Sequence, residues 1–185
     1  MMKRIGLACV MAVVLAVAGC GTAAGTSPAP AAAFNDTDVM FLQMMVAYHD
    51  PSAKLTGLGA QKATSQEVRQ LAAAMKSTEA DEQTAILDWL RAWNQPEVPA
   101  TDAVLHADHG GLPADGKAQL DSLAKEPAAK FDKSLLRMLI GHLHAVVEVA
   151  RMEVASGVHP EVKAFATRIA DSRRAQVAYM LQLAE

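Results

Sequence analysis

The sequence repeats after 94 residues, and this internal repeat narrows the choice of fold more than any other feature. With this shift, residues 44–49 align with residues 138–143, and residues 67–72 align with residues 161–166, without a gap between them. One helical hairpin cannot bury its apolar stripe by itself, whereas two copies can pack together as a four-helix bundle. We therefore interpret the chain as a duplicated helical hairpin.

The residue types in the repeat indicate an all-α domain. Helix-favouring residues such as Ala, Leu, Met, Glu and Lys dominate, and Gly and Pro fall between the long periodic segments. Helices are predicted at residues 36–61, 65–93, 132–156 and 160–183. They form hairpins 34–95 and 131–185 of a single domain, residues 34–185, and the long central connection is expected to carry a short helix around residues 117–123.

Local signals mark the ends of these helices. The Thr-Ser-Gln-Glu sequence of residues 64–67 resembles a capping box that opens the second helix. Gly157 is suited to end the third helix, and Pro160 is suited to the first turn of the fourth. Pro51 removes a helical hydrogen bond, so the first helix is expected to kink or end there.

The N-terminal segment has the pattern of a lipoprotein signal peptide. Two basic residues precede an apolar run that is too short to span a bilayer comfortably, and the run closes on a lipobox-like Val-Ala-Gly-Cys. Residues 1–19 are therefore expected to be removed, and Cys20 is expected to carry lipid. Residues 20–33 form a flexible tether, which places the domain outside the cytoplasm on the cell membrane.

Composition excludes several functional classes. Cys9 lies in the signal peptide and Cys20 is expected to be acylated, so no thiol remains for a disulfide, a metal site or a nucleophile. Removal of the signal peptide leaves 15 basic and 20 acidic residues, a net charge of −5. This balance argues against nucleic acid as a partner. The expected contacts are the membrane, a metal ion, and a second copy of the chain or an envelope protein.

Polar side chains interrupt the apolar stripe of every long helix at one level of the predicted bundle. They are His49 at the edge of the stripe that contains Tyr48 on the first helix, Glu79 and Glu82 on the second, His142 on the third, and Arg173 and Gln176 on the fourth. The two interruptions on the fourth helix lie one repeat after those on the second. Because an unpaired buried charge is costly, these groups must meet each other, a metal ion or water.

Two interpretations of these side chains remain open. In the first they form a transition-metal site between helices, with imidazole, carboxylate and thioether ligands from His49, His142, Glu79, Glu82, Met45 and Met138. In the second no metal binds, and the charged groups form a network in which Arg173 pairs with Glu79 and Glu82, and His142, Tyr48 and Gln176 complete the hydrogen bonds. The Arg173 cation disfavours a second cation beside it, which supports the second interpretation.

Catalytic signatures are not found in the sequence. It has no Glu-x-x-His pair of di-iron bundles, no His-Glu-x-x-His motif, no nucleophile elbow and no phosphate-binding glycine loop, so the chain is not expected to be an enzyme. His106 and His109 in the connection form a further candidate site for Cu(II) or Zn(II), for which a solvated loop is the simpler interpretation.

Residues 34–45 and 131–138, together with Trp89-Leu90 and the Gly-Gly-Leu-Pro sequence at residues 110–113, resemble a secreted bacterial family known as domain of unknown function 305. The resemblance covers nearly the whole mature domain and implies a ferritin-like four-helix fold. Some members of the family are linked to copper binding and copper tolerance. The resemblance therefore implies a role in copper binding or copper homeostasis.

This chain departs from the family at the expected ligands. The family has a His-His pair in each hairpin, followed on the next helix by Gln-x-x-Glu-Ile-x-x-Met. Here residues 48–49 are Tyr-His and residues 142–143 are His-Leu, so each pair keeps one histidine. Glu79-x-x-Glu82 keeps only the glutamate, and Arg173-x-x-Gln176 keeps neither residue. The alternative function is thus a metal-free envelope lipoprotein that acts through protein contacts.

Overall fold

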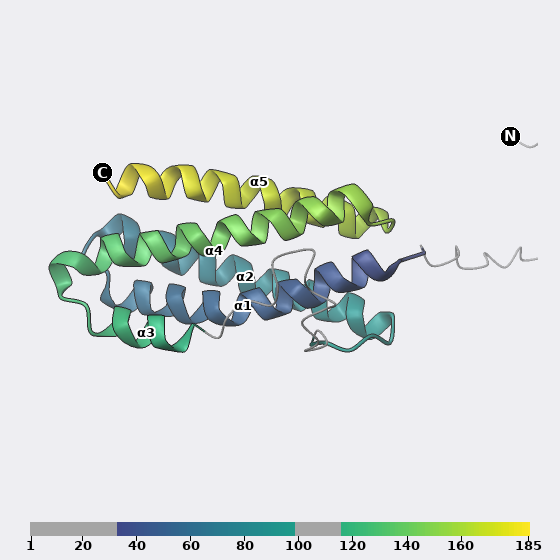
Figure 1. Ribbon diagram of the computed structural model, residues 1–185, viewed down its shortest axis with the longest axis horizontal. Helices are drawn as coiled ribbons and strands as arrows, with labels where there is room; N and C mark the ends of the chain where they lie inside the picture. The colour runs from purple at the N-terminus through teal and green to yellow at the C-terminus, as the bar shows by residue number, and fades with distance from the viewer. Residues whose placement is uncertain (1–32, 99–115) are drawn as a thin grey trace, which may run out of the picture. The chain divides into compact units, whose positions relative to one another are not determined.

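A computed structural model describes residues 33–98 and 116–185, and all regular structure in these two ranges is helical. Figure 1 shows α1 and α2 as one hairpin and α4 and α5 as another, with the short α3 beside α1. The helices are α1 (Asp36–Lys62), α2 (Gln66–Ala92), α3 (Lys117–Ala124), α4 (Ala128–Ser156) and α5 (Pro160–Leu183). The prediction of an all-α bundle is confirmed.

The sequence repeat is also a repeat of structure. A shift of 94 residues brings α1 onto α4 and α2 onto α5. Within each hairpin the two helices pack against each other, and α1 packs against α4 to join the hairpins. Two apolar clusters fill the interior, one around Phe41 and Phe165 and the other around Phe131 and Leu139. Apolar burial of this kind, rather than helix propensity, is what stabilises long helices in a bundle.

Two predicted helix features differ from the structure. Of the two effects expected of Pro51, an end of the first helix is excluded, because α1 continues through the proline as far as Lys62. The lost backbone hydrogen bond is offset by burial of α1 on both sides of the proline, against α2 and α4. The capping box at residues 64–67 is also absent: Ser65 is the N-cap and accepts from the Val68 amide, while Thr64 binds Asp132.

Two other helix ends lie where the sequence predicted them, and one lies four residues away. Gly157 is the C-cap of α4, and Pro160 lies in the first turn of α5. The third long helix starts four residues earlier than predicted, at Ala128, after Pro127 as N-cap. A proline at a helix start costs little, since its missing N–H would have no partner inside the helix.

Two equivalent aspartates tie the hairpins together, and we call them the aspartate clasps. Asp38, near the start of α1, accepts hydrogen bonds from the Val158 and His159 amides in the turn before α5. One repeat later, Asp132 near the start of α4 accepts from the Thr64 and Ser65 amides in the turn before α2. Each hairpin thus caps the turn of the other, and the carboxylate satisfies amides that a helix start leaves without partners.

Three predictions lie outside the described residues. They are the signal peptide with its Cys20, the tether up to residue 32, and the His106–His109 pair in the connection. Among the helices that are described, none is long and apolar enough to cross a membrane.

Candidate functional site

The polar side chains predicted to interrupt the apolar stripes meet in the middle of the bundle, between the two apolar clusters. Glu79 and Glu82 come from α2, Arg173 from α5, and His49 from α1. Arg173 is 1% exposed, Glu79 is 4% exposed and His49 is 7% exposed, so water contributes little to their solvation. Charged groups buried to this extent must be compensated by each other or by a bound ion.

Arg173 forms ion pairs with both glutamates. Its Nη2 donates a hydrogen bond to Glu82 Oε2 and lies 3.8 Å from Glu79 Oε1. Glu79 Oε1 also accepts a hydrogen bond of 2.9 Å from the Ser52 hydroxyl on α1. The ion pairs that the metal-free interpretation requires are therefore present. Two carboxylates and one guanidinium leave the centre one positive charge short of neutrality.

His49 is oriented by a neighbour that the sequence did not single out. Its Nδ1 lies 2.8 Å from Gln83 Oε1 on α2. An amide oxygen can only accept, so Nδ1 carries the hydrogen and Nε2 presents a lone pair in the neutral ring. Nε2 faces Glu82 Oε2 at 3.4 Å and makes no hydrogen bond. Two acceptors this close repel each other unless a proton or another cation lies between them.

Glu79 has one oxygen that no hydrogen bond satisfies. Its Oε2 is buried without a partner. Burial raises the pKa of Glu79, and this effect exceeds the opposing effects of Arg173 and Ser52. The centre therefore favours an additional positive charge, supplied by a proton or by a metal ion.

A pocket lies beside this centre, between α1 and α2. It has a volume of about 330 Å³ and its lining includes His49, Glu79 and Gln83, with Asp50 and Lys76 among the other residues. A ligand of the size of a metal ion can reach His49 Nε2 and Glu79 Oε2, the unpartnered acceptor atoms of these two residues, only if such an opening exists.

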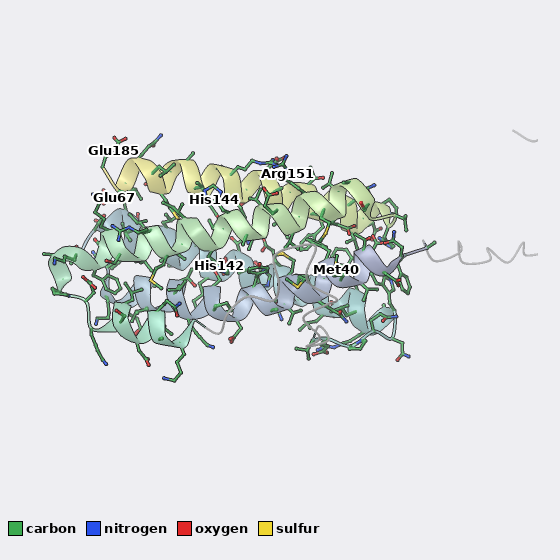
Figure 2. All side chains as sticks on the ribbon, in the orientation of Figure 1. Met40, Glu67, His142, His144, Arg151 and Glu185 are labelled. Carbon is green, nitrogen blue, oxygen red and sulfur yellow. The ribbon has the colours of Figure 1, made fainter. Side chains whose placement is uncertain are left out.

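His142 belongs to the same centre on the side of α4, where Figure 2 shows it between α4 and α1. Burial, together with the nearby His49 and Arg173, lowers the pKa of His142 to about 4. The ring is thus neutral at ordinary pH and keeps one nitrogen lone pair. Tyr48 contacts it edge to face, with ring centroids 5.5 Å apart. Met45 is fully buried in the adjoining apolar cluster.

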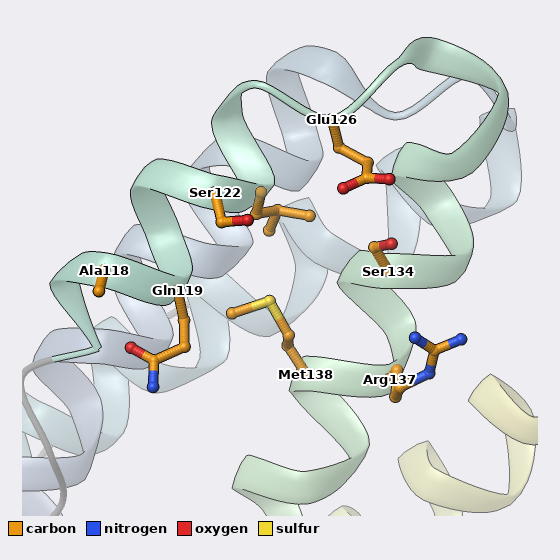
Figure 3. Close-up of a pocket in the computed structure, with 8 residues that line it drawn as sticks. Ala118, Gln119, Ser122, Glu126, Ser134, Arg137 and Met138 are labelled. Carbon is orange, nitrogen blue, oxygen red and sulfur yellow. The ribbon is translucent and has the colours of Figure 1, made fainter.

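Two predicted members take other positions. Met138 lines a different pocket, of about 410 Å³, with Gln119 and Ser122 of α3, as Figure 3 shows. It therefore lies apart from the polar centre. Gln176 has a buried side-chain oxygen without a hydrogen-bond partner, so it does not complete the network around Arg173 through that atom.

Sequence reasoning missed Ser52 and Gln83, which hold Glu79 and His49 in place. Ser52 follows His49 by three residues and so shares its helix face, which is a usable signal. Gln83 follows Glu79 by four residues and shares its helix face in the same way, although the spacing does not show that it contacts His49. Within residues 33–98 and 116–185, no three His, Cys, Asp or Glu side chains are arranged to hold a metal ion by themselves.

The family model described as "Domain of unknown function (DUF305)" matches residues 38–184. The chain belongs to the DUF305 family. The match spans both hairpins and both aspartate clasps, so the duplicated hairpin is the family fold and not an addition to it. No match is found among curated proteins.

Solved DUF305 structures have the same fold. A fragment from Deinococcus radiodurans shares 21% identity, with 84% of this chain and 98% of that chain covered and a TM-score of 0.70. A "putative secreted protein" from Streptomyces coelicolor shares 21% identity over 80% and 91% of the two chains, with a TM-score of 0.72. CopM in its Cu(II)-bound form shares 26% identity over 80% and 95%, with a TM-score of 0.66.

Proposed function

We propose that this DUF305 domain binds one copper ion outside the cytoplasm, in the centre between its hairpins, and that it is a binding protein and not an enzyme. His49 Nε2 and Glu82 Oε2, 3.4 Å apart, are the proposed first ligands. Glu79 and His142 belong to the same centre but are not arranged with them as a closed site, so they would have to move to complete the coordination. Imidazole nitrogen with carboxylate oxygen is a donor set that suits Cu(II).

The observation that carries this proposal is the orientation of His49. Gln83 fixes the hydrogen on Nδ1, so the lone pair of Nε2 points at Glu82 Oε2 across 3.4 Å. Histidines that bind metals usually donate the other ring N–H to an oxygen in this way. The shortfall of one positive charge and the pocket between α1 and α2 supply the electrostatic reason and the route.

Similar proteins support copper as the ion. CopM, at 26% identity, has been solved with Cu(II) bound and also with Cu(I) and silver bound. This centre offers fewer free ligand atoms than a closed metal site does, because Arg173 already pairs with both glutamates. We therefore expect an exchangeable ion, as suits a protein that buffers or hands over copper, and not a permanently held cofactor.

The test is calorimetric titration of the whole protein with Cu(II) and with Cu(I), compared among three variants. His49→Ala is expected to weaken Cu(II) binding by at least about tenfold, and Gln83→Ala by about tenfold because the ring loses its support. His144→Ala is the matched control, since His144 is exposed on α4 and outside the centre. Equal affinity in all variants, or affinity no better than millimolar, would sink the proposal.

A second candidate function is a metal-free envelope lipoprotein that acts through protein contacts. The paired Arg173 is the observation that favours it, because a guanidinium can replace a metal ion between two carboxylates. If copper does not bind to the wild-type protein, this candidate stands. Arg173 then has a structural role only.

The lipobox-like sequence before Cys20 supports a membrane anchor for either function. Dual acylation holds a protein stably on a membrane, whereas a single chain does not. Cys20→Ser is expected to move the protein from the membrane fraction to the soluble fraction. Retention of the variant in the membrane fraction would argue against this anchor.

A further inference from the structure

One end of the bundle contains two buried carboxyl groups side by side. Asp38 on α1 and Glu153 on α4 are both 0% exposed, and their side chains interact directly. Neither residue takes part in the polar centre around Arg173. As two carboxylates they would have no donor between them, and two like charges in contact in the interior are strongly unfavourable.

The surroundings of Asp38 hold it in the ionised form. It accepts backbone N–H bonds from Asn35 at 2.7 Å, from Val158 at 3.2 Å and from His159 at 2.9 Å. Burial by itself raises the pKa of Asp38, but these hydrogen bonds outweigh burial and lower it below 3.8 overall. The negative charge of the pair is therefore located on Asp38.

Glu153 is in the opposite situation. Both of its carboxyl oxygens are buried without a hydrogen-bond partner. Burial raises the pKa of Glu153 to about 8, and the neighbouring negatively charged Asp38 side chain acts in the same direction. A proton on Glu153 would supply the missing donor and satisfy one of its oxygens, so the protonated form is the one that fits.

Charged groups on the neighbouring elements do not remove this preference. From α5, Lys163 lowers the pKa of Glu153, but by less than burial and Asp38 raise it. His159, the N-cap of α5, uses its Nδ1 to accept from the Val162 amide, and its ring lies 5.1 Å from that of Trp93 at the end of α2. Asp38 already accepts three backbone hydrogen bonds, so the small cation that fits between the carboxyl groups is a proton.

Gly157 provides the space that Glu153 requires. A Cβ atom at residue 157 would lie 2.0 Å from Glu153 Oε1. The backbone there has φ −64°, which any residue can adopt, so the glycine is needed for room and not for its conformational freedom. The glycine and the glutamate therefore form one unit with the Asp38 clasp.

The other clasp lacks this unit and is an internal reference. One repeat earlier, Gly59 stands in place of Glu153, and Ala63 stands in place of Gly157. Asp132 accepts from the turn amides of Thr64 and Ser65 without a second carboxyl group beside it. The two clasps thus share the hydrogen bonds from two turn amides, whereas Asp38 also accepts from the Asn35 amide and has the buried acid beside it.

We propose that Asp38 and Glu153 hold a single proton between them, and that this proton closes a pH-sensitive clasp joining α1 to the turn between α4 and α5. Loss of the proton places two negative charges in a dry interior and loosens the turn that contains Val158 and His159. The Asp132 clasp has no such dependence. The bundle therefore opens at one end first when the surroundings become alkaline.

The direction of the pH effect follows from linkage. A carboxyl group whose pKa is raised on folding binds more protons in the folded state than in the unfolded state. Its stabilising contribution is complete below the ordinary value of 4.5 and is lost as the pH rises to about 8. Within this window the folding equilibrium falls by at most about tenfold per pH unit for one proton.

The test is amide hydrogen exchange on the full chain, read at both clasps in the same sample. Protection of the Val158 and His159 amides, relative to that of Thr64 and Ser65, is expected to fall by at least about tenfold between about pH 6 and about pH 8. Glu153→Gln, which keeps a donor at all pH values, should abolish the fall. Glu148→Gln, the same change at an exposed site on α4, should leave it intact.

Two outcomes would overturn the proposal. One is parallel loss of protection at both clasps in the wild-type protein, and the other is an unchanged fall in Glu153→Gln. If that variant does not fold, the carbon-13 shift of the Glu153 carboxyl group in the wild-type protein decides the matter. A midpoint near 8 supports the shared proton, and a midpoint near 4.5 contradicts it.

Discussion

The hairpin α1–α2 and the hairpin α4–α5 have the same backbone plan but different charges. In the middle of the bundle, Glu79 of the first hairpin corresponds to Arg173 of the second, one repeat later. At the ends, Asp38 and Asp132 correspond and perform the same task, since each accepts amides from the turn of the other hairpin. The aspartates that accept the turn amides are the same in both copies, whereas Glu79 and Arg173, which meet across the interior, have opposite charges.

This comparison shows how a duplicated fold can acquire an asymmetric centre. A symmetric pair of hairpins would bring four carboxylates or four neutral groups together at one level. Here one hairpin supplies the two carboxylates and the other supplies the guanidinium that partly neutralises them. The remaining imbalance of one charge is what makes the centre a candidate site for a cation.

The largest effect is expected when this complementarity is broken. Arg173→Met keeps the size of the side chain and removes its charge, which leaves Glu79 and Glu82 buried without a counter-ion. We expect a loss of about 4 kcal/mol in the free energy of unfolding near neutral pH, measured by urea denaturation. The loss should shrink at low pH, because the raised pKa of Glu79 lets that group take up a proton.

Arg174→Met is the matched control for this variant. Arg174 is the next residue on α5 and its ion pair with Asp171 is exposed. Exposed pairs contribute at most about 1 kcal/mol, so the control should unfold at nearly the wild-type urea concentration. Equal losses in the two variants would show that the charge of Arg173 does not stabilise the buried carboxylates of Glu79 and Glu82.

An intermediate effect is expected at the clasps. Asp38→Ala should lower the free energy of unfolding by about 3 kcal/mol, because it leaves buried backbone amides without an acceptor. Asp132→Ala should cost about 1 kcal/mol, because its turn is partly exposed and water can replace the carboxylate. Thermal unfolding of the two variants at the same pH measures the difference. Equal costs would show that the two clasps do not differ in burial as the structure indicates.

An effect smaller than that of Asp38→Ala is expected at the space beside Glu153. Gly157→Ala should destabilise the protein by about 2 kcal/mol, since the added methyl group displaces the Glu153 carboxyl group. When Glu153 is already replaced by Ala, Gly157→Ala should cost much less, because the carboxyl group that the methyl group displaces is gone. The comparison is between the double variant and Glu153→Ala alone. Additive losses in a double-mutant cycle would mean that the glycine acts independently of the glutamate.

Much of the bundle follows from the sequence, because hydrophobic periodicity and the repeat both report helix faces. The bounds of α5 and the start of α1 agree with the sequence, and the ion pairs of Arg173 follow from placing opposite charges on facing stripes. An end of the first helix at Pro51 was wrongly expected, because a local rule was applied to a helix that tertiary packing supports on two sides.

The side-chain contacts of the site could not be predicted from hydrophobic periodicity and the repeat. Met138 shares the stripe of His142, yet it lines a pocket with residues of α3, a neighbour that the periodicity of α4 does not reveal. Gln83 matters only because of the direction in which His49 points, which periodicity does not specify. Glu153 could have been found, since it continues the spacing of Val146 and Val149 on the buried face of α4.

The reciprocal arrangement of the clasps has a consequence for the halves of the chain. Each hairpin lacks the acceptor for its own turn and receives it from the other, while each presents an apolar face that only the other covers. Neither half is therefore a complete folding unit. Two separate fragments cut between the hairpins should recognise each other and reassemble, so the protein offers a natural division point for a split reporter.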